Sequence, residues 1–142
     1  SQRMLAMRAA SELALATLQD ACGAGGNDPG DFADGLYLGA RETIDRCCVD
    51  PRFDVARLAA IMGCSRAQLY RLFHAREQGI AATIWSARLQ RARRMLCARQ
   101  YLALSIAEVA LRSGFLDAST FSRMFRHRYG MSPRDTREAW MR

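Results

Sequence analysis

Two stretches of the chain share one pattern, FDVARLAAIMGCSRAQLYRLF at residues 53–73 and LSIAEVALRSGFLDASTFSRMF at residues 104–125. Before the turn, four small or apolar residues recur 51 positions later, and the pairs are Val55 and Ile106, Leu58 and Val109, Ala59 and Ala110, and Gly63 and Gly114. After the turn, Leu69, Arg71, Leu72 and Phe73 recur 52 positions later as Phe121, Arg123, Met124 and Phe125. The pattern indicates two copies of one small structural unit, with one extra residue in the second turn.

Each copy is typical of two short helices joined by a tight turn. A capping residue starts the first helix, a glycine ends it, and a second capping residue starts the next helix. These residues are Asp54, Gly63 and Ser65 in the first copy and Ser105, Gly114 and Asp117 in the second. Glu108, three residues after Ser105, completes a capping-box pattern. The second helix of each copy has an apolar face, so each copy predicts a helix-turn-helix unit.

Charge supports this interpretation, because any two-helix corner can imitate a single helix-turn-helix. Residues 1–51 contain 4 Arg and 8 Asp or Glu, whereas residues 52–142 contain 17 Arg and 6 Asp or Glu, so the net charges are −4 and +11. A basic segment around two such units predicts a partner that carries phosphates, as DNA does. All 21 basic residues are Arg, which suits phosphate and guanine edges, although genome base composition explains the same bias equally well.

The segment from about Ala81 to Ala98 lacks Gly and Pro and has an apolar stripe, so it predicts a connector helix roughly 27 Å long. One turn of B-DNA is about 34 Å, so such a helix could hold two recognition helices in successive major-groove segments. The predicted fold class is all-α, with two helix-turn-helix subdomains joined by a long connector helix and preceded by an N-terminal helix and linker.

The N-terminal part differs from the rest in composition. Residues 3–20 predict a helix with a broad apolar surface, which either packs on this chain or forms a dimer seam or a contact with another domain. Residues 22–34 are rich in Gly, Asn, Asp and Pro and predict a flexible linker. We therefore place a domain boundary between residues 33 and 34. Asp34 is expected to precede a helix that reaches about Cys48 and ends before Pro51.

Other classes of protein find little support in the sequence. The five cysteines include no CxxC pair and no nearby His at metal spacing, so reduced thiols and no metal or other cofactor are expected. His74 and His127 have no evident nucleophile partner, so we expect no catalytic residues and no enzyme activity. No apolar stretch is long enough to span a membrane.

The segment from about Leu36 to Arg137 resembles the DNA-binding domain of AraC/XylS transcription regulators. The most specific part is SIAEVALRSGFLDASTFSRMFRHRYGMSPRDTR at residues 105–137, with its GF, F-S-R-x-F and Y-G-x-S-P elements. The resemblance covers about 100 of the 142 residues. It implies helix-turn-helix units at about 54–74 and 105–127 within an AraC-type domain over residues 34–142. It also implies sequence-specific binding to double-stranded DNA for transcription regulation, with activation favoured over repression.

The resemblance places DNA contacts on the second helix of each unit. The candidate DNA-binding residues are Arg66, Ala67, Gln68, Tyr70 and Arg71 in the first unit and Ala118, Ser119, Thr120, Ser122 and Arg123 in the second. Arg71 can donate two hydrogen bonds to guanine, and Ala67 can contact a thymine methyl group. Alternatives also remain open: Arg71 and Arg123 contact phosphate or an acid of the domain, Tyr70 only covers the apolar rim, and Gln68 points to the backbone or to solvent. Arg91, Arg93 and Arg94 of the connector are more typical of a solvated face.

Partners follow from the same resemblance. Regulators of this family usually have a separate N-terminal sensor domain that often dimerises, and we expect that domain and its effector site to be absent from this chain. RNA polymerase is a further candidate partner, as is a second copy bound through residues 3–20 or through the absent domain. No membrane partner is expected, and the expected location is cytoplasmic and nucleoid-associated. The competing interpretation is a dimerisation or protein-interaction fragment with only nonspecific DNA affinity.

Overall fold

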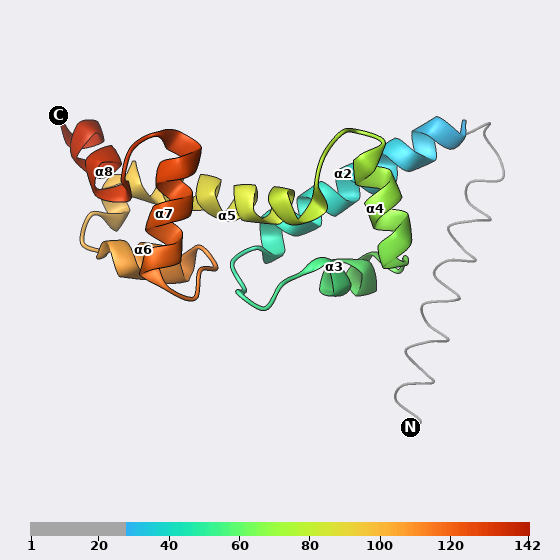
Figure 1. The fold of residues 1–142 in the computed structure, drawn as a ribbon, viewed down its shortest axis with the longest axis horizontal. Helices are drawn as coiled ribbons and strands as arrows, with labels where there is room; N and C mark the ends of the chain where they lie inside the picture. The colour runs from blue at the N-terminus through green and yellow to red at the C-terminus, as the bar shows by residue number, and fades with distance from the viewer. Residues whose placement is uncertain (1–27) are drawn as a thin grey trace, which may run out of the picture. The chain divides into compact units, whose positions relative to one another are not determined.

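The computed structural model describes residues 28–142, and the helix predicted over residues 3–20 lies outside the described residues. Within 28–142 the secondary structure is entirely helical, which confirms the all-α fold class (Figure 1). The elements are α2 (Pro29–Cys47), α3 (Val55–Met62), α4 (Arg66–His74), α5 (Ile80–Leu96), the 3-10 helix η2 (Arg99–Tyr101), α6 (Ile106–Arg112), α7 (Ala118–Tyr129) and α8 (Pro133–Met141). The chain divides into two compact parts, Ser1–Leu38 and Gly39–Arg142, and α2 crosses the division. Both helix-turn-helix units lie in the second part.

Helix α2 begins earlier than the sequence predicted. The helix was expected to follow Asp34, at the end of a linker over residues 22–34, but it starts at Pro29. A proline is well suited to the first helical position, because its fixed φ matches the helix and its missing N–H would have no partner there. Asp31 in the first turn adds a favourable charge. Residues 29–34 therefore belong to the helix despite their turn-forming character.

The capping residues predicted for the two helix-turn-helix units are confirmed. The Asp54 carboxylate accepts from the Arg57 N–H at 2.9 Å, and Ser105 forms a reciprocal capping box with Glu108. Gly63 ends α3 at φ 66°, and Gly114, just after α6, has φ 94°. Both glycines thus occupy the left-handed region that favours this residue. Helix α7 continues two residues past the predicted end, to Tyr129, and Gly130 caps it at φ 74°.

Helix α5 belongs to both helix-turn-helix units. Its first half packs against α4 and buries Ile80 and Ile84. Its second half contributes to the core of the second unit, whose buried members are Leu89, Ala92, Met95, Leu96, Val109, Ala110, Phe115, Phe121 and Phe125. Figure 1 shows α5 running from α4 to the group formed by α6, α7 and α8. The single helix α5 therefore packs against both α4 and α7.

Candidate nucleic-acid interface

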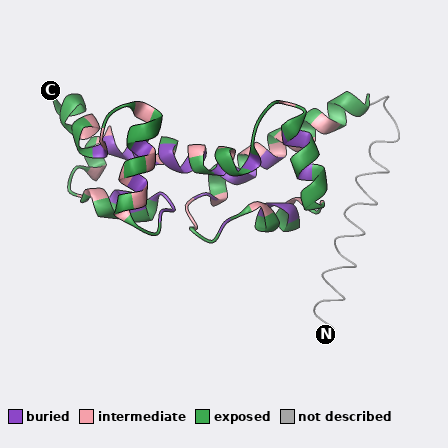
Figure 2. Ribbon diagram, viewed as in Figure 1, coloured by how far each residue is buried: buried purple, intermediate pink, exposed green. Residues whose placement is uncertain are grey.

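Helix α4, the predicted recognition helix of the first unit, has an apolar side turned inward and a polar side turned outward. Leu69, Leu72 and Phe73 are buried, as the sequence predicted. On the other side lie exposed candidate residues, namely Arg66, Ala67, Gln68, Tyr70 and Arg71. Tyr70 is 53% exposed, which is high for a large aromatic residue. Figure 2 shows this division of α4 into a buried and an exposed side.

Helix α7, the predicted recognition helix of the second unit, exposes its candidate residues less fully. Phe121 and Phe125 are buried, and Met124 packs against the same core. Ser119 and Arg123 are exposed, whereas Ala118, Thr120 and Ser122 are half-buried. Among the predicted candidates, α7 therefore offers short hydroxyl side chains and one arginine, in contrast to the two arginines and the tyrosine of α4. Arg126 and Arg128, which were not among the candidates, are also exposed on α7.

Two candidates use their polar groups within the protein. The Gln68 side-chain oxygen accepts from the Ser65 N–H at 2.8 Å, while the Ser65 hydroxyl accepts from the Gln68 N–H. This capping box was not predicted, although Gln three residues after Ser is its sequence signature. The Thr120 hydroxyl donates to the Asp117 carboxylate at 2.8 Å. Gln68 and Thr120 consequently have less hydrogen-bonding capacity left for bases than the other candidates.

The caps of the two recognition helices differ in charge. Neutral Ser65 caps α4, whereas the carboxylate of Asp117 caps α7 and accepts from the Thr120 N–H at 2.7 Å. Hydrogen bonds from the Thr120 backbone and side chain hold the pKa of Asp117 below its ordinary value, with a smaller effect of the Arg123 charge. Asp117 is therefore ionised at neutral pH, and its charge lies at the start of the predicted DNA-facing helix.

Of the three connector arginines predicted to lie on a solvated face, Arg91 and Arg93 have contacts within the protein. The Arg91 guanidinium donates to the Arg112 carbonyl at 3.3 Å, which ties α5 to the end of α6. Arg93 lies over the Tyr129 ring, with its guanidinium carbon 4.9 Å from the ring centroid. Arg94 is exposed and has no such contact among the described residues. The solvated-face alternative thus fits Arg94, and packing within the second unit accounts for Arg91 and Arg93.

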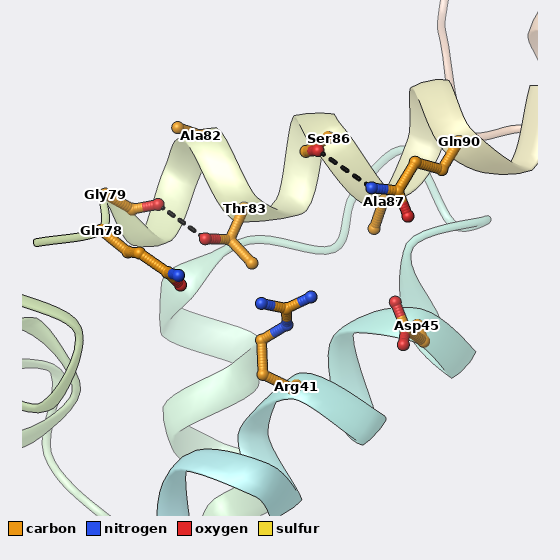
Figure 3. A pocket seen from close by; sticks show the side chains of 9 residues that line it. All are labelled: Arg41, Asp45, Gln78, Gly79, Ala82, Thr83, Ser86, Ala87 and Gln90. Atoms are coloured by element: carbon orange, nitrogen blue, oxygen red, sulfur yellow. Dashed lines mark hydrogen bonds between the residues drawn. The ribbon is translucent and has the colours of Figure 1, made fainter. Parts of the chain in front are cut away.

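A polar pocket of about 290 Å³ lies between α2 and α5 (Figure 3). Its wall includes Arg41 and Asp45 from α2, and Thr83 and Ser86 from α5. Thr83 donates to the Gly79 carbonyl at 2.9 Å on the same wall. None of the ten candidate DNA-binding residues lines this pocket. It is therefore separate from the predicted interface.

The part of the chain that the structure describes shows neither a metal-binding cluster nor a membrane-spanning helix. Within residues 28–142, no group of three or more His, Cys, Asp or Glu side chains is arranged to bind a metal ion. Over the same range, no helix combines the length and the apolar character needed to cross a bilayer. Cys47, Cys48, Cys64 and Cys97 are free thiols.

Solved structures with the same arrangement of helices include DNA-binding proteins. A transcriptional regulator from Chromobacterium violaceum, described as containing an AraC-type DNA-binding domain, superposes with a TM-score of 0.66 at 25% identity, over 74% of this chain and 91% of that one. The DNA-binding domain of AdpA, a global transcriptional factor solved in complex with a target DNA, superposes with a TM-score of 0.59 at 27% identity. That similarity covers 80% of this chain and 94% of the AdpA domain.

Sequence comparisons identify the same family. The transcriptional activator NphR from a Rhodococcus species is 36% identical over 93 residues, which are 66% of this chain but only 27% of NphR. The chain thus spans about a quarter of the length of that relative. A family described as a helix-turn-helix domain matches residues 58–139, which contain most of both units and all of α5. Because this match covers more than half of the chain, the protein belongs to the AraC/XylS-type family of helix-turn-helix DNA-binding domains.

Proposed function

We propose that the chain binds specific sequences in double-stranded DNA by placing α4 and α7 in successive segments of the major groove, and that it thereby regulates transcription. The observation that carries this proposal is the pairing of two recognition helices on one connector. Each begins at a side-chain cap, buries an apolar side and exposes a polar one. Helix α5 joins them and, with 17 residues, is about 26 Å long. That length is somewhat below the roughly 34 Å of one DNA turn.

The relatives support the class of partner and the direction of regulation. AdpA was solved with a target DNA, and NphR is described as a transcriptional activator. The charge of +11 over residues 52–142 supplies the sequence-independent attraction to phosphates that such binding requires. Activation is therefore the proposed mode, with RNA polymerase as a candidate partner and the cytoplasmic nucleoid as the proposed location.

The two units are assigned different tasks within this function. Arg71 and Arg66 on α4 present ten donor N–H groups to the groove edge, and the exposed Tyr70 lies between them on the helix. The first unit therefore supplies most base discrimination. The second unit, with Ser119, Ser122 and Arg123, holds the register on the sugar-phosphate backbone.

The experiment that tests the proposal is selection of bound sites from random duplex DNA, carried out at two salt concentrations. We expect a motif with two elements whose centres are about one helical turn apart. We also expect the preference for that motif to persist at the higher salt concentration, because base contacts do not depend on counterion release. Recovery of unrelated sequences with a steep loss of binding in salt would instead support the alternative of a protein-interaction fragment with nonspecific DNA affinity.

Dimerisation is a separate question, because the apolar helix predicted over residues 3–20 lies outside the described residues. A size measurement of the chain with and without residues 1–27 addresses it. Retention of the two-element motif by the shortened chain would show that a single copy contributes both elements. A motif that loses one element on shortening would show that two copies bind together.

A further inference from the structure

The side chain of Arg88 is a buried cation at the midpoint of α5. Its relative exposure is 3%, and it lies eight residues from each end of the helix. Within residues 28–142 the structure shows no ion pair to this guanidinium. Burying a charge costs free energy unless hydrogen bonds replace those lost to water. The hydrogen-bond partners of Arg88 therefore indicate its structural role.

Those partners are backbone carbonyls of the segment that connects α2 to α3 in the first unit. Arg88 Nε donates to the Cys48 carbonyl at 2.8 Å. Its Nη2 donates to the carbonyls of Asp50 and Phe53, each at 3.0 Å. One planar side chain thus holds three carbonyls of a loop that lies 35–40 residues away in the sequence. Lysine cannot reproduce this fork, because its ammonium is a point donor.

The same carbonyl is approached from the second unit. Gly114, in the turn between α6 and α7, lies so close that a Cβ there would overlap the Cys48 carbonyl oxygen and would be 2.9 Å from Arg88 Nε. The Arg88 guanidinium carbon also lies 4.7 Å from the centroid of the Trp85 ring. The Trp85 ring in turn packs on the Phe115 ring, with 5.5 Å between the two ring centroids. The turn of the second unit therefore contacts the loop of the first directly at the position where Arg88 binds.

We propose that Arg88 sets the rotation of one helix-turn-helix unit relative to the other, and so determines which spacing between two DNA elements the protein accepts. This inference rests on the proposed function.

Only α5 connects the two units along the chain, and a single helix can bend or twist at its midpoint. Contacts across the midpoint oppose that motion. Inserting one base pair between two elements rotates them by about 35° and separates them by about 3.4 Å. A locked pair of units cannot follow that change, whereas an unlocked pair can.

The test is selection from random duplex DNA by three proteins in parallel: the unchanged chain, Arg88→Gln and Arg94→Gln. Arg94 lies on the same helix and is exposed, so its replacement removes the same charge without touching the contacts of Arg88. We expect the unchanged chain and Arg94→Gln to recover two elements at one spacing, preferred about tenfold over spacings one base pair longer or shorter, which corresponds to about 1.4 kcal/mol. Arg88→Gln should recover the same elements over several spacings, with the preference reduced to about threefold or less.

The outcomes separate this inference from the proposed function. If Arg88→Gln recovers the same single spacing as the unchanged chain, Arg88 does not set the spacing and the inference is wrong. If the unchanged chain recovers no two-element motif, the proposed function fails and the inference fails with it. A loss of folding alone would lower binding to all spacings equally, so it would leave the spacing preference unchanged. Should Arg88→Gln not fold, Arg88→Lys retains the charge but not the fork, and the same broadening is expected of it.

Discussion

The two helix-turn-helix units share a sequence pattern but differ in how tightly their turns are enclosed. Gly63 in the first unit has open space where a Cβ would lie, whereas the equivalent Gly114 packs on the Cys48 carbonyl and Arg88. The first unit exposes its turn and its arginines. The second places its turn against the rest of the domain. The comparison indicates that one repeated motif has been adapted to two tasks, presenting side chains and anchoring the pair.

The largest predicted difference between the units concerns these two glycines. Gly114→Ala should lower the free energy of unfolding by about 3–5 kcal/mol, because left-handed strain and overlap with the backbone act together. Gly63→Ala should lower it by only about 1 kcal/mol, since strain acts alone there. Urea unfolding monitored by circular dichroism measures both values. Equal losses in the two variants would show that the close approach at Gly114 relaxes without cost.

The two glycines also illustrate what the sequence could and could not predict. Their position at the helix ends and the neighbouring caps were predicted, because glycine and capping residues act on the local backbone. The close approach at Gly114 was not, since it depends on contact with Cys48, which is 66 residues earlier. The partners of Arg88 were missed for the same reason. Among the candidate site residues, the outward position of Arg71 follows from helical periodicity, whereas the use of Gln68 in a capping box depends on the chosen rotamer.

The next prediction compares the arginines at equivalent positions of α4 and α7. Arg71→Ala should weaken binding to the selected DNA by about 1–3 kcal/mol and relax the preference at one base position. Arg123→Ala should weaken binding to all sequences alike and reduce the slope of affinity against salt by about one counterion. Titrations of labelled duplexes carrying single base changes, repeated at several salt concentrations, measure both effects.

A matched control is available in the first unit. The side chain of Arg52 is 88% exposed and lies in the loop before α3, so Arg52→Ala removes the same charge away from α4. It should leave the base preference unchanged. If Arg71→Ala behaves like Arg52→Ala, weakening all duplexes equally, Arg71 contacts phosphate and the division of tasks between the units is wrong.

A smaller effect is expected at the neutral cap of α4. Ser65→Ala should cost about 1 kcal/mol of folding stability, because it removes one half of the capping box with Gln68. Ser65→Asp should retain the cap and therefore the stability, while it adds a negative charge beside the predicted DNA face. Thermal unfolding and DNA titration of both variants separate the two consequences. Unchanged DNA affinity in Ser65→Asp would argue against a position of the α4 N-terminus near phosphates.

The smallest predicted effect concerns the charged cap of α7 and its response to pH. Because hydrogen bonds from Thr120 hold the folded-state pKa of Asp117 below its ordinary value, the unfolded chain takes up a proton there first as pH falls. The stabilising contribution of the charge is therefore complete above the ordinary pKa of an aspartate and is lost as pH drops through the folded-state value.

Asp117→Asn retains a capping oxygen without the charge. Its stability should be lower than that of the unchanged chain near neutral pH, and the gap should close towards about pH 2. Glu108 and Asp50 also have lowered pKa values, but they are present in both proteins and cancel in the difference. A gap that stays constant with pH would assign the effect to the lost Thr120 hydroxyl bond instead, and the charge of the Asp117 cap would then contribute nothing to stability.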